Sequence, residues 1–185
     1  LSAVTLCCLA NVGQSPLIHH NVFFSRDYAT EFQQIDTEGR LPDDPTIYIC
    51  AQDRGDDDAP RDVDRLLVLI NAPGRADVRE ISERELDACL NQALGQLSSM
   101  GLDLDLQAQV IRGPDEWNRL FPGSGGAIYG AASKRWNSTL KRHGATTKLK
   151  GLYLAGGSIH PGAGVPMAAL SGRTAASQVQ VDFPR

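Results

Sequence analysis

The C-terminal part of the chain contains a nearly uncharged segment, residues 151–176, in which glycine and proline separate two apolar stretches. Residues 152–155 are apolar and favour a short strand, whereas the small residues from Met167 onward favour a helix. Pro166 suits the first turn of that helix, where its missing N–H is harmless. The turn carries four glycines, which tolerate positive φ angles and leave room for a ligand: Gly156, Gly157, Gly162 and Gly164. The segment therefore predicts a strand, a glycine-rich turn and a helix.

A helix that begins beside bare glycine backbone has the outline of a cofactor site. Its first N–H groups lack partners within the helix and carry a partial positive charge of about +0.5, so they attract anions and electron-rich ring edges. Gly162 and Gly164 do not complete the dinucleotide fingerprint, because that motif needs a third glycine where Met167 stands. Pyrophosphate binding of the usual kind is therefore not supported. The alternative is an ordinary glycine-rich turn that binds nothing.

Upstream of this segment, strands and helices are predicted in an order unlike a regular alternation. Apolar and β-branched stretches predict five strands, over residues 2–10, 17–24, 46–51, 65–72 and 107–112. The first lacks a clean alternation, so we expect it to be buried on both faces. Two short helices are predicted, over residues 27–36 and 114–120. The order indicates an α+β fold, with a mainly antiparallel sheet and flanking helices, followed by the terminal strand, turn and helix.

The clearest local prediction is a long amphipathic helix. Ser82 and Glu85 have the spacing of a capping box, in which each side chain binds a backbone N–H of the first turn. Gly101 is placed to end the helix. Apolar residues between them recur at helical spacing and predict one buried stripe: Leu86, Cys89, Leu90, Ala93, Leu94 and Leu97.

Bulk properties exclude several classes of function. The 185 residues carry a net charge of −4 and no cluster of Lys and Arg, so we expect no nucleic-acid partner. No apolar run approaches the roughly 18 residues that span a bilayer, and no secretory signal is visible. The four cysteines form no CxxC pair, which favours small buried hydrophobes in a reducing cytoplasm: Cys7, Cys8, Cys50 and Cys89.

No metal site is predicted. His19 and His20 are adjacent within a predicted strand, where neighbouring side chains face opposite ways, so they are not expected to chelate one ion together. Residues 53–64 are strongly polar and predict an exposed loop. Their acidic residues do not have the spacing of an EF-hand.

Three segments resemble one known family, the bacterial carotenoid desaturases of the phytoene dehydrogenase type, which are FAD-dependent and have an amine-oxidase-like architecture. The segment "GLYLAGGSIHPGAGVPMAALSGRTAA" is similar to the family's C-terminal signature, and "FPGSGGAIYG" is similar to the stretch before it. The segments "LIHHNVFFSRDYATEFQQI" and "LPDDPTIYICAQDR" are similar to its substrate-domain strands. The sequences of the segments "FPGSGGAIYG" and "LAGGSIHPGAGVPMAALSGR" are most similar to those of the branch that acts on hydroxylated or methoxylated carotenoids.

The resemblance implies an organisation and a site. Residues 1–120 would be part of a substrate domain and residues 121–185 part of the FAD domain, with the Rossmann half lying before Leu1. The chain opens in strand composition without Met, as expected of a piece of a longer protein. Such a piece is expected to bind FAD weakly or not at all. The residues expected to line the flavin are Gly156, Gly157, Gly164, Val165 and Met167, with His160 beside them as either a polar contact or a turn residue satisfied by backbone.

The resemblance also implies an apolar polyene substrate and a cytoplasmic protein associated peripherally with the inner membrane. No catalytic residue is assigned, because hydride removal from a hydrocarbon does not need a strong base on every pathway. Four aromatic residues are candidates either for a substrate tunnel or for ordinary core packing: Trp117, Phe121, Tyr129 and Trp136. The alternative to a desaturase fragment is a non-catalytic module that binds an apolar ligand or another subunit.

Overall fold

The chain forms two units, Leu1–Ile128 and Tyr129–Arg185, in a computed structural model that describes residues 1–55, 62–130 and 142–184. We describe each unit by itself. The assignment of residues 1–120 to a substrate domain and 121–185 to a flavin domain concerns roles as well as boundaries, and it stays a prediction.

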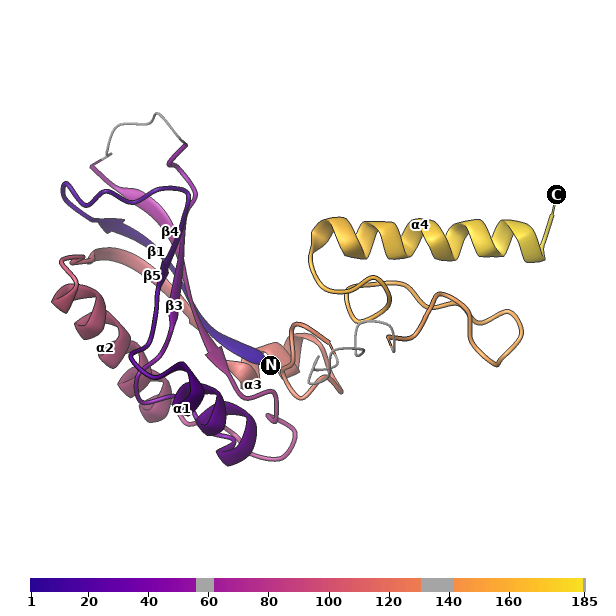
Figure 1. Cartoon of the computed structure of the whole chain (residues 1–185), viewed down its shortest axis with the longest axis horizontal. Helices are drawn as coiled ribbons and strands as arrows, with labels where there is room; N and C mark the ends of the chain where they lie inside the picture. Colours follow the sequence, from indigo (N-terminus) through magenta and orange to yellow (C-terminus); the bar gives the residue numbers. More distant parts are fainter. Residues whose placement is uncertain (56–61, 131–141, 185) are drawn as a thin grey trace. The chain divides into compact units, whose positions relative to one another are not determined.

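A five-stranded antiparallel sheet organises the first unit (Figure 1). Its order is β2-β3-β4-β1-β5, so β1 is an inner strand and pairs with both β4 and β5. The strands are β1 (Ser2–Asn11), β2 (His20–Phe23), β3 (Ile47–Ala51), β4 (Asp64–Ala72) and β5 (Asp105–Arg112). The predicted α+β class with a mainly antiparallel sheet is therefore confirmed for the part of the chain that is described.

Strand β2 is shorter than predicted because a side chain takes over its first hydrogen bonds. Asn21 Oδ1 accepts the N–H of Ile18 at 3.1 Å, and Asn21 Nδ2 donates to the carbonyl of Ile18 at 2.6 Å. This local pairing bends the chain before the strand begins. Residues 17–19 therefore precede the strand, which begins at His20, although the His19 carbonyl still accepts the N–H of Ala51 in β3 at 2.9 Å.

Helices lie where their local signals predict them. Asp27 caps α1 (Tyr28–Gln33), which continues into the π-helical turn η1 (Gln34–Glu38). Helix α2 (Glu83–Ser99) has the predicted capping box, and α3 (Pro114–Leu120) has the predicted bounds. Helix α4 (Val165–Asp182) belongs to the second unit.

One face of the sheet is covered by α2 and forms the core (Figure 1). Cys89, Leu90, Ala93 and Leu97 of α2 pack with apolar strand residues, which include Val4, Leu6, Ile49, Val68 and Ile70. The expectation that β1 is buried on both faces is wrong for its second half. From Cys7 onward exposed and buried residues alternate, so the opposite face is open there.

We call this second surface the open face. Its residues follow from the strand register: His20 of β2 pairs with Cys50 of β3, Cys50 with Leu67 of β4, Leu67 with Cys7 of β1, and Cys7 with Val110 of β5. Paired residues in adjacent strands point to the same side of a sheet. One row of side chains thus crosses all five strands on the open face.

The predicted exposed loop contains a buried ion pair instead. Arg54 is 3% exposed and Asp64 is fully buried; Arg54 Nη2 lies 2.7 Å from Asp64 Oδ2, and Arg54 Nε lies 3.0 Å from Asp64 Oδ1. Arg54 Nη1 also donates to the carbonyl of Ser15 at 2.8 Å. The pair anchors the loop before β2 to the first residue of β4. Residues 56–61 lie outside the described ranges.

We expect Arg54→Met to lower the free energy of unfolding by about 3–5 kcal/mol, because it leaves the Asp64 carboxylate buried without its partner. Chemical denaturation of the full chain measures this. Arg26→Met removes an exposed partner of Asp44 and should cost less than about 1 kcal/mol. Equal effects of the two substitutions would contradict a structural role for the buried pair.

A second prediction concerns pH and the start of α2. The Ser82 hydroxyl, the Ser82 backbone N–H and the Arg79 guanidinium lower the pKa of Glu85 below its ordinary value of 4.5. A lowered pKa stabilises the fold above the ordinary value, and this contribution is lost as the pH falls through the folded-state pKa. Glu85→Gln should therefore cost a few tenths of a kcal/mol near neutral pH, since the group is partly exposed, and progressively less as the pH falls below 4.5.

Denaturation of both forms across this range measures the difference. Glu83→Gln removes a charge from the same turn without touching the capping box, so its cost should change less with pH. A cost of Glu85→Gln that is constant with pH would rule out the charge as its cause.

Candidate functional site

The start of α4 is open, as the sequence predicts. Gly164 is the N-cap with φ 104° and ψ 146°, and Pro166 lies in the first turn. Within the described ranges no side chain caps this end, and the first turn holds no acidic residue. Val165 is 84% exposed. The amides of Val165 and Met167 therefore have no side-chain cap to compete with a ligand.

Two glycines leave space beside this helix end. Gly156 and Gly164 have φ angles of 128° and 104°, which side-chain-bearing residues rarely adopt. A Cβ at either position would meet no described atom within 4 Å. At Gly157 a Cβ would lie 3.7 Å from Ala163 Cα, an ordinary contact. The turn thus keeps bare backbone at the positions expected to approach a ligand, and these residues fit the edge of a flat ring.

The predicted strand over residues 152–155 is wrong. Tyr153 forms a single bridge with Thr146, and Leu154 donates its N–H to the carbonyl of Ala145 at 2.8 Å. A strand needs a neighbour along its length, and the described part of this unit provides one bridge. The segment before the turn is therefore extended chain held at two points.

Two side chains that the sequence analysis missed hold the turn. Ser171 is fully buried on α4, and its Oγ accepts the Gly156 N–H at 3.2 Å. Arg142 Nη1 donates to the carbonyl of Gly157, and Arg142 Nη2 to the carbonyl of Tyr129, both at 3.2 Å. Ser171 and Ala175 are buried four residues apart, a spacing that could have identified the helix face. No local signal identifies Arg142.

His160 lies in the same turn. Its backbone N–H donates to the carbonyl of His143 at 2.8 Å, and the residue is exposed. The backbone contact agrees with the turn interpretation of this residue. A contact from its ring to flavin or substrate stays a prediction.

The far end of α4 is tied to the same segment. The Tyr153 hydroxyl donates to Asp182 Oδ2, and this hydrogen bond raises the pKa of Tyr153 above its ordinary value. Contacts near both ends of α4 thus join it to the chain that precedes the turn, through Gly156 and Tyr153.

Three of the four candidate aromatic residues lie within the described ranges. Trp117 Nε1 donates to the carbonyl of Ala3 at 3.0 Å, which is a structural role. Phe121 is 59% exposed, and burial raises the pKa of Tyr129 above its ordinary value. Trp136 lies outside the described residues. On the open face, a shallow hollow is lined by the apolar residues Cys7, Leu9 and Val110 together with polar residues that include Gln52 and Arg65.

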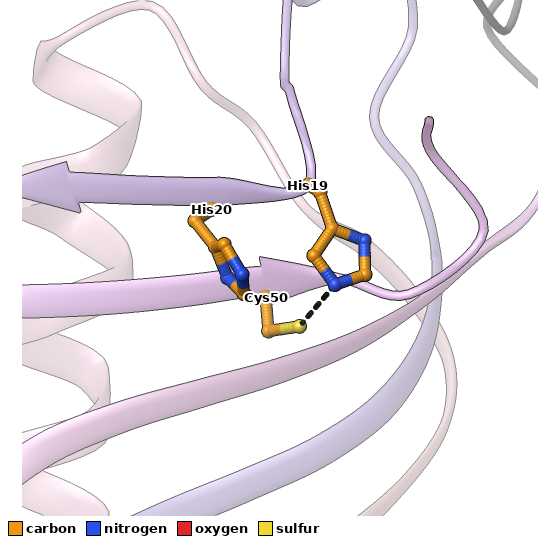
Figure 2. A group of neighbouring side chains, drawn as sticks. All are labelled: His19, His20 and Cys50. Atoms are coloured by element: carbon orange, nitrogen blue, oxygen red, sulfur yellow. Dashed lines mark hydrogen bonds between the residues drawn. The ribbon is translucent and has the colours of Figure 1, made fainter. Parts of the chain in front are cut away.

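The prediction that His19 and His20 face opposite ways is wrong. Because His19 precedes β2, strand alternation does not apply to it. Their ring centroids lie 4.4 Å apart, and Cys50 completes a cluster with them (Figure 2).

Among the helices of residues 1–55, 62–130 and 142–184, none combines the length and apolar composition needed to cross a membrane.

Comparison with known proteins places these features in a family. Residues 19–180 match the model of flavin containing amine oxidoreductases. The chain is 48% identical over 182 residues to a hydroxyneurosporene desaturase of Rubrivivax gelatinosus, covering 95% of this chain and 34% of that protein. It is 40% identical over 185 residues to a hydroxyneurosporene desaturase of Cereibacter sphaeroides, covering 99% of this chain and 37% of that protein.

A 4,4'-diaponeurosporene oxygenase of Staphylococcus aureus is 33% identical over 169 residues, which cover 88% of this chain and 34% of that protein. The chain thus spans about a third of the length of these relatives. The resemblance to carotenoid desaturases is confirmed, and the chain belongs to the family of flavin containing amine oxidoreductases.

Proposed function

We propose that this chain is the C-terminal part of an FAD-dependent oxidoreductase that desaturates a carotenoid. In this proposal the second unit contacts the isoalloxazine end of the flavin, and the sheet of the first unit contributes to the polyene site. The observation that carries the proposal is the uncapped start of α4 beside open glycine backbone. Its support from relatives is the match to two hydroxyneurosporene desaturases.

The open helix end has a defined electrostatic task in such an enzyme. A bound flavin supplies the hydride acceptor of a desaturation and gains electron density in doing so. The N–H groups of Val165 and Met167 would hold its electron-rich edge, because a helix N-terminus favours negative charge. Pro166 between them has no N–H and leaves these two amides as the donors. Ser171 and Arg142 would act by keeping the turn in place.

The substrate side needs an apolar surface and few polar groups. A polyene offers no hydrogen-bonding groups along its chain, so its binding depends on buried apolar area. The open face provides Cys7, Leu9, Leu67 and Val110 for such contacts. No residue of the chain is assigned as a base. Since the substrate dissolves in membranes, we expect a peripheral association of the whole protein with the bilayer.

The proposed role of α4 predicts a charge-specific effect at its first residue. In the full-length protein, Val165→Asp should weaken flavin retention and lower desaturation by about tenfold, which corresponds to about 1.4 kcal/mol, because its carboxylate would repel the electron-rich edge of the ring. An acidic residue there favours the helix itself, so unfolding does not explain a loss. Flavin absorbance after gel filtration and pigment extraction from cells supplied with candidate carotenoids measure the two effects.

Val165→Asn is the matched control, because it has the shape of Asp without the charge. It should stay within about twofold of the parent protein. Equal losses of flavin retention and desaturation in the Asp and Asn variants would contradict an electrostatic role for this helix end.

The chain by itself should not retain FAD, because the proposed site supplies contacts to one end of the cofactor. Dialysis of the purified 185-residue chain with FAD, followed by absorbance, measures this. A yellow sample with FAD at unit stoichiometry would contradict the prediction. Full-length protein that binds FAD but leaves every supplied carotenoid unchanged would instead favour the non-catalytic module.

A further inference from the structure

Three potential metal ligands converge at the end of the sheet where β2 begins (Figure 2). One ligand atom from each of His19, His20 and Cys50 lies within 4.8 Å of the other two. His19 Nε2 and Cys50 Sγ lie 3.7 Å apart. In a tetrahedral zinc site a bound nitrogen and a bound sulfur are about 3.6 Å apart, given the usual bond lengths. The His19 and Cys50 atoms are therefore already spaced as ligands of one ion.

The sheet register holds Cys50 and His20 together. They are directly paired in the antiparallel ladder of β2 and β3, and both belong to the open face. Such a pair has its Cβ atoms about 5 Å apart, which suits a shared ion. His19 joins them because the pairing of Asn21 with Ile18 keeps it out of the strand. The feature that shortened β2 thus also brings His19 to the same side.

Each imidazole is oriented by a further contact, made through its Nδ1 atom. His19 Nδ1 lies 3.2 Å from the carbonyl of Arg54, which can only accept, so Nδ1 carries the proton and Nε2 has its lone pair directed elsewhere. His20 Nδ1 lies 2.8 Å from the Tyr48 hydroxyl. A ring nitrogen fixed by a carbonyl or hydroxyl is the usual arrangement of metal-binding histidines. Arg54 is itself held by the buried pair with Asp64, so the carbonyl has a fixed position.

We propose that His19, His20 and Cys50 bind a divalent ion of the zinc class, with water in the fourth position. Two imidazoles and one thiolate are ligands that zinc prefers, and three protein ligands leave one site open. On binding, the Cys50 S–H gives its proton to solvent and the sulfur binds the metal as a thiolate. The site uses none of the residues proposed to contact the flavin, so the two proposals can be tested independently. It would fasten the edge strand β2 to β3.

Cobalt(II) provides a direct test, because it accepts zinc ligands and a bound thiolate gives it an intense charge-transfer absorption. The untagged full chain, titrated with Co²⁺, should show this band with one equivalent bound, and Zn²⁺ should abolish it by displacement. Cys50→Ser should remove the band, and His20→Asn should weaken binding at least about tenfold. Circular dichroism establishes that both variants fold.

Cys7→Ser is the matched control. Cys7 lies on the same open face in the same row, two strands from Cys50, and it is exposed. This variant should keep both the band and the affinity. A second measurement needs no variant: Zn²⁺ should slow alkylation of Cys50 and leave that of Cys7 unchanged. Absence of a thiolate band at about 1 mM Co²⁺, or its survival in Cys50→Ser, would overturn the proposal.

Discussion

The architecture of the first unit depends on a sheet whose two faces are covered unequally. Helix α2 buries one face through Leu90, Ala93 and Leu97, and among the described residues no helix is equally packed on the other. An antiparallel sheet tolerates this, since one face can remain accessible while the other forms the core. The side chains available for chemistry are therefore those whose register directs them to the open face. They include the thiols of Cys7 and Cys50 and the imidazole of His20.

The second unit depends on a different constraint, the unsatisfied backbone at the start of α4. A helix end without a cap exposes amides that water or a ligand must satisfy. Gly164 gives the chain the φ angle needed to enter the helix, and Ser171 secures the preceding turn through Gly156. The helix start lacks the stabilisation that a capping side chain would give, and its backbone N–H groups stay open to a ligand. Departures of this kind from local stability rules are common at functional sites.

The sequence predicted best what local chemistry decides. Ser82, Glu85 and Gly101 bound α2, and Pro114 and Pro166 lie in the first turns of their helices, because caps and proline act within a few residues. Predictions from the sequence were wrong where contacts between residues distant in the sequence determine the structure. The polar run that contains Arg54 and Asp64 predicts an exposed loop, yet both side chains are buried, because each neutralises the charge of the other.

Within the proposed flavin site, Gly156 and Gly164 were found from composition, whereas Arg142 acts from a segment without any recognisable motif. The convergence of His19 on Cys50 depends on the Asn21 side chain, which a strand pattern does not reveal.

The adjacent cysteines Cys7 and Cys8 of β1 make the alignment of this inner strand chemically detectable. Cys7 is exposed, whereas burial, with a smaller contribution from Cys7, raises the pKa of Cys8 to about 11. Sliding the strand by one residue would exchange their environments, since side chains alternate between faces. A thiol reagent therefore distinguishes the native alignment from a slipped one by which neighbour it marks, with no engineered probe.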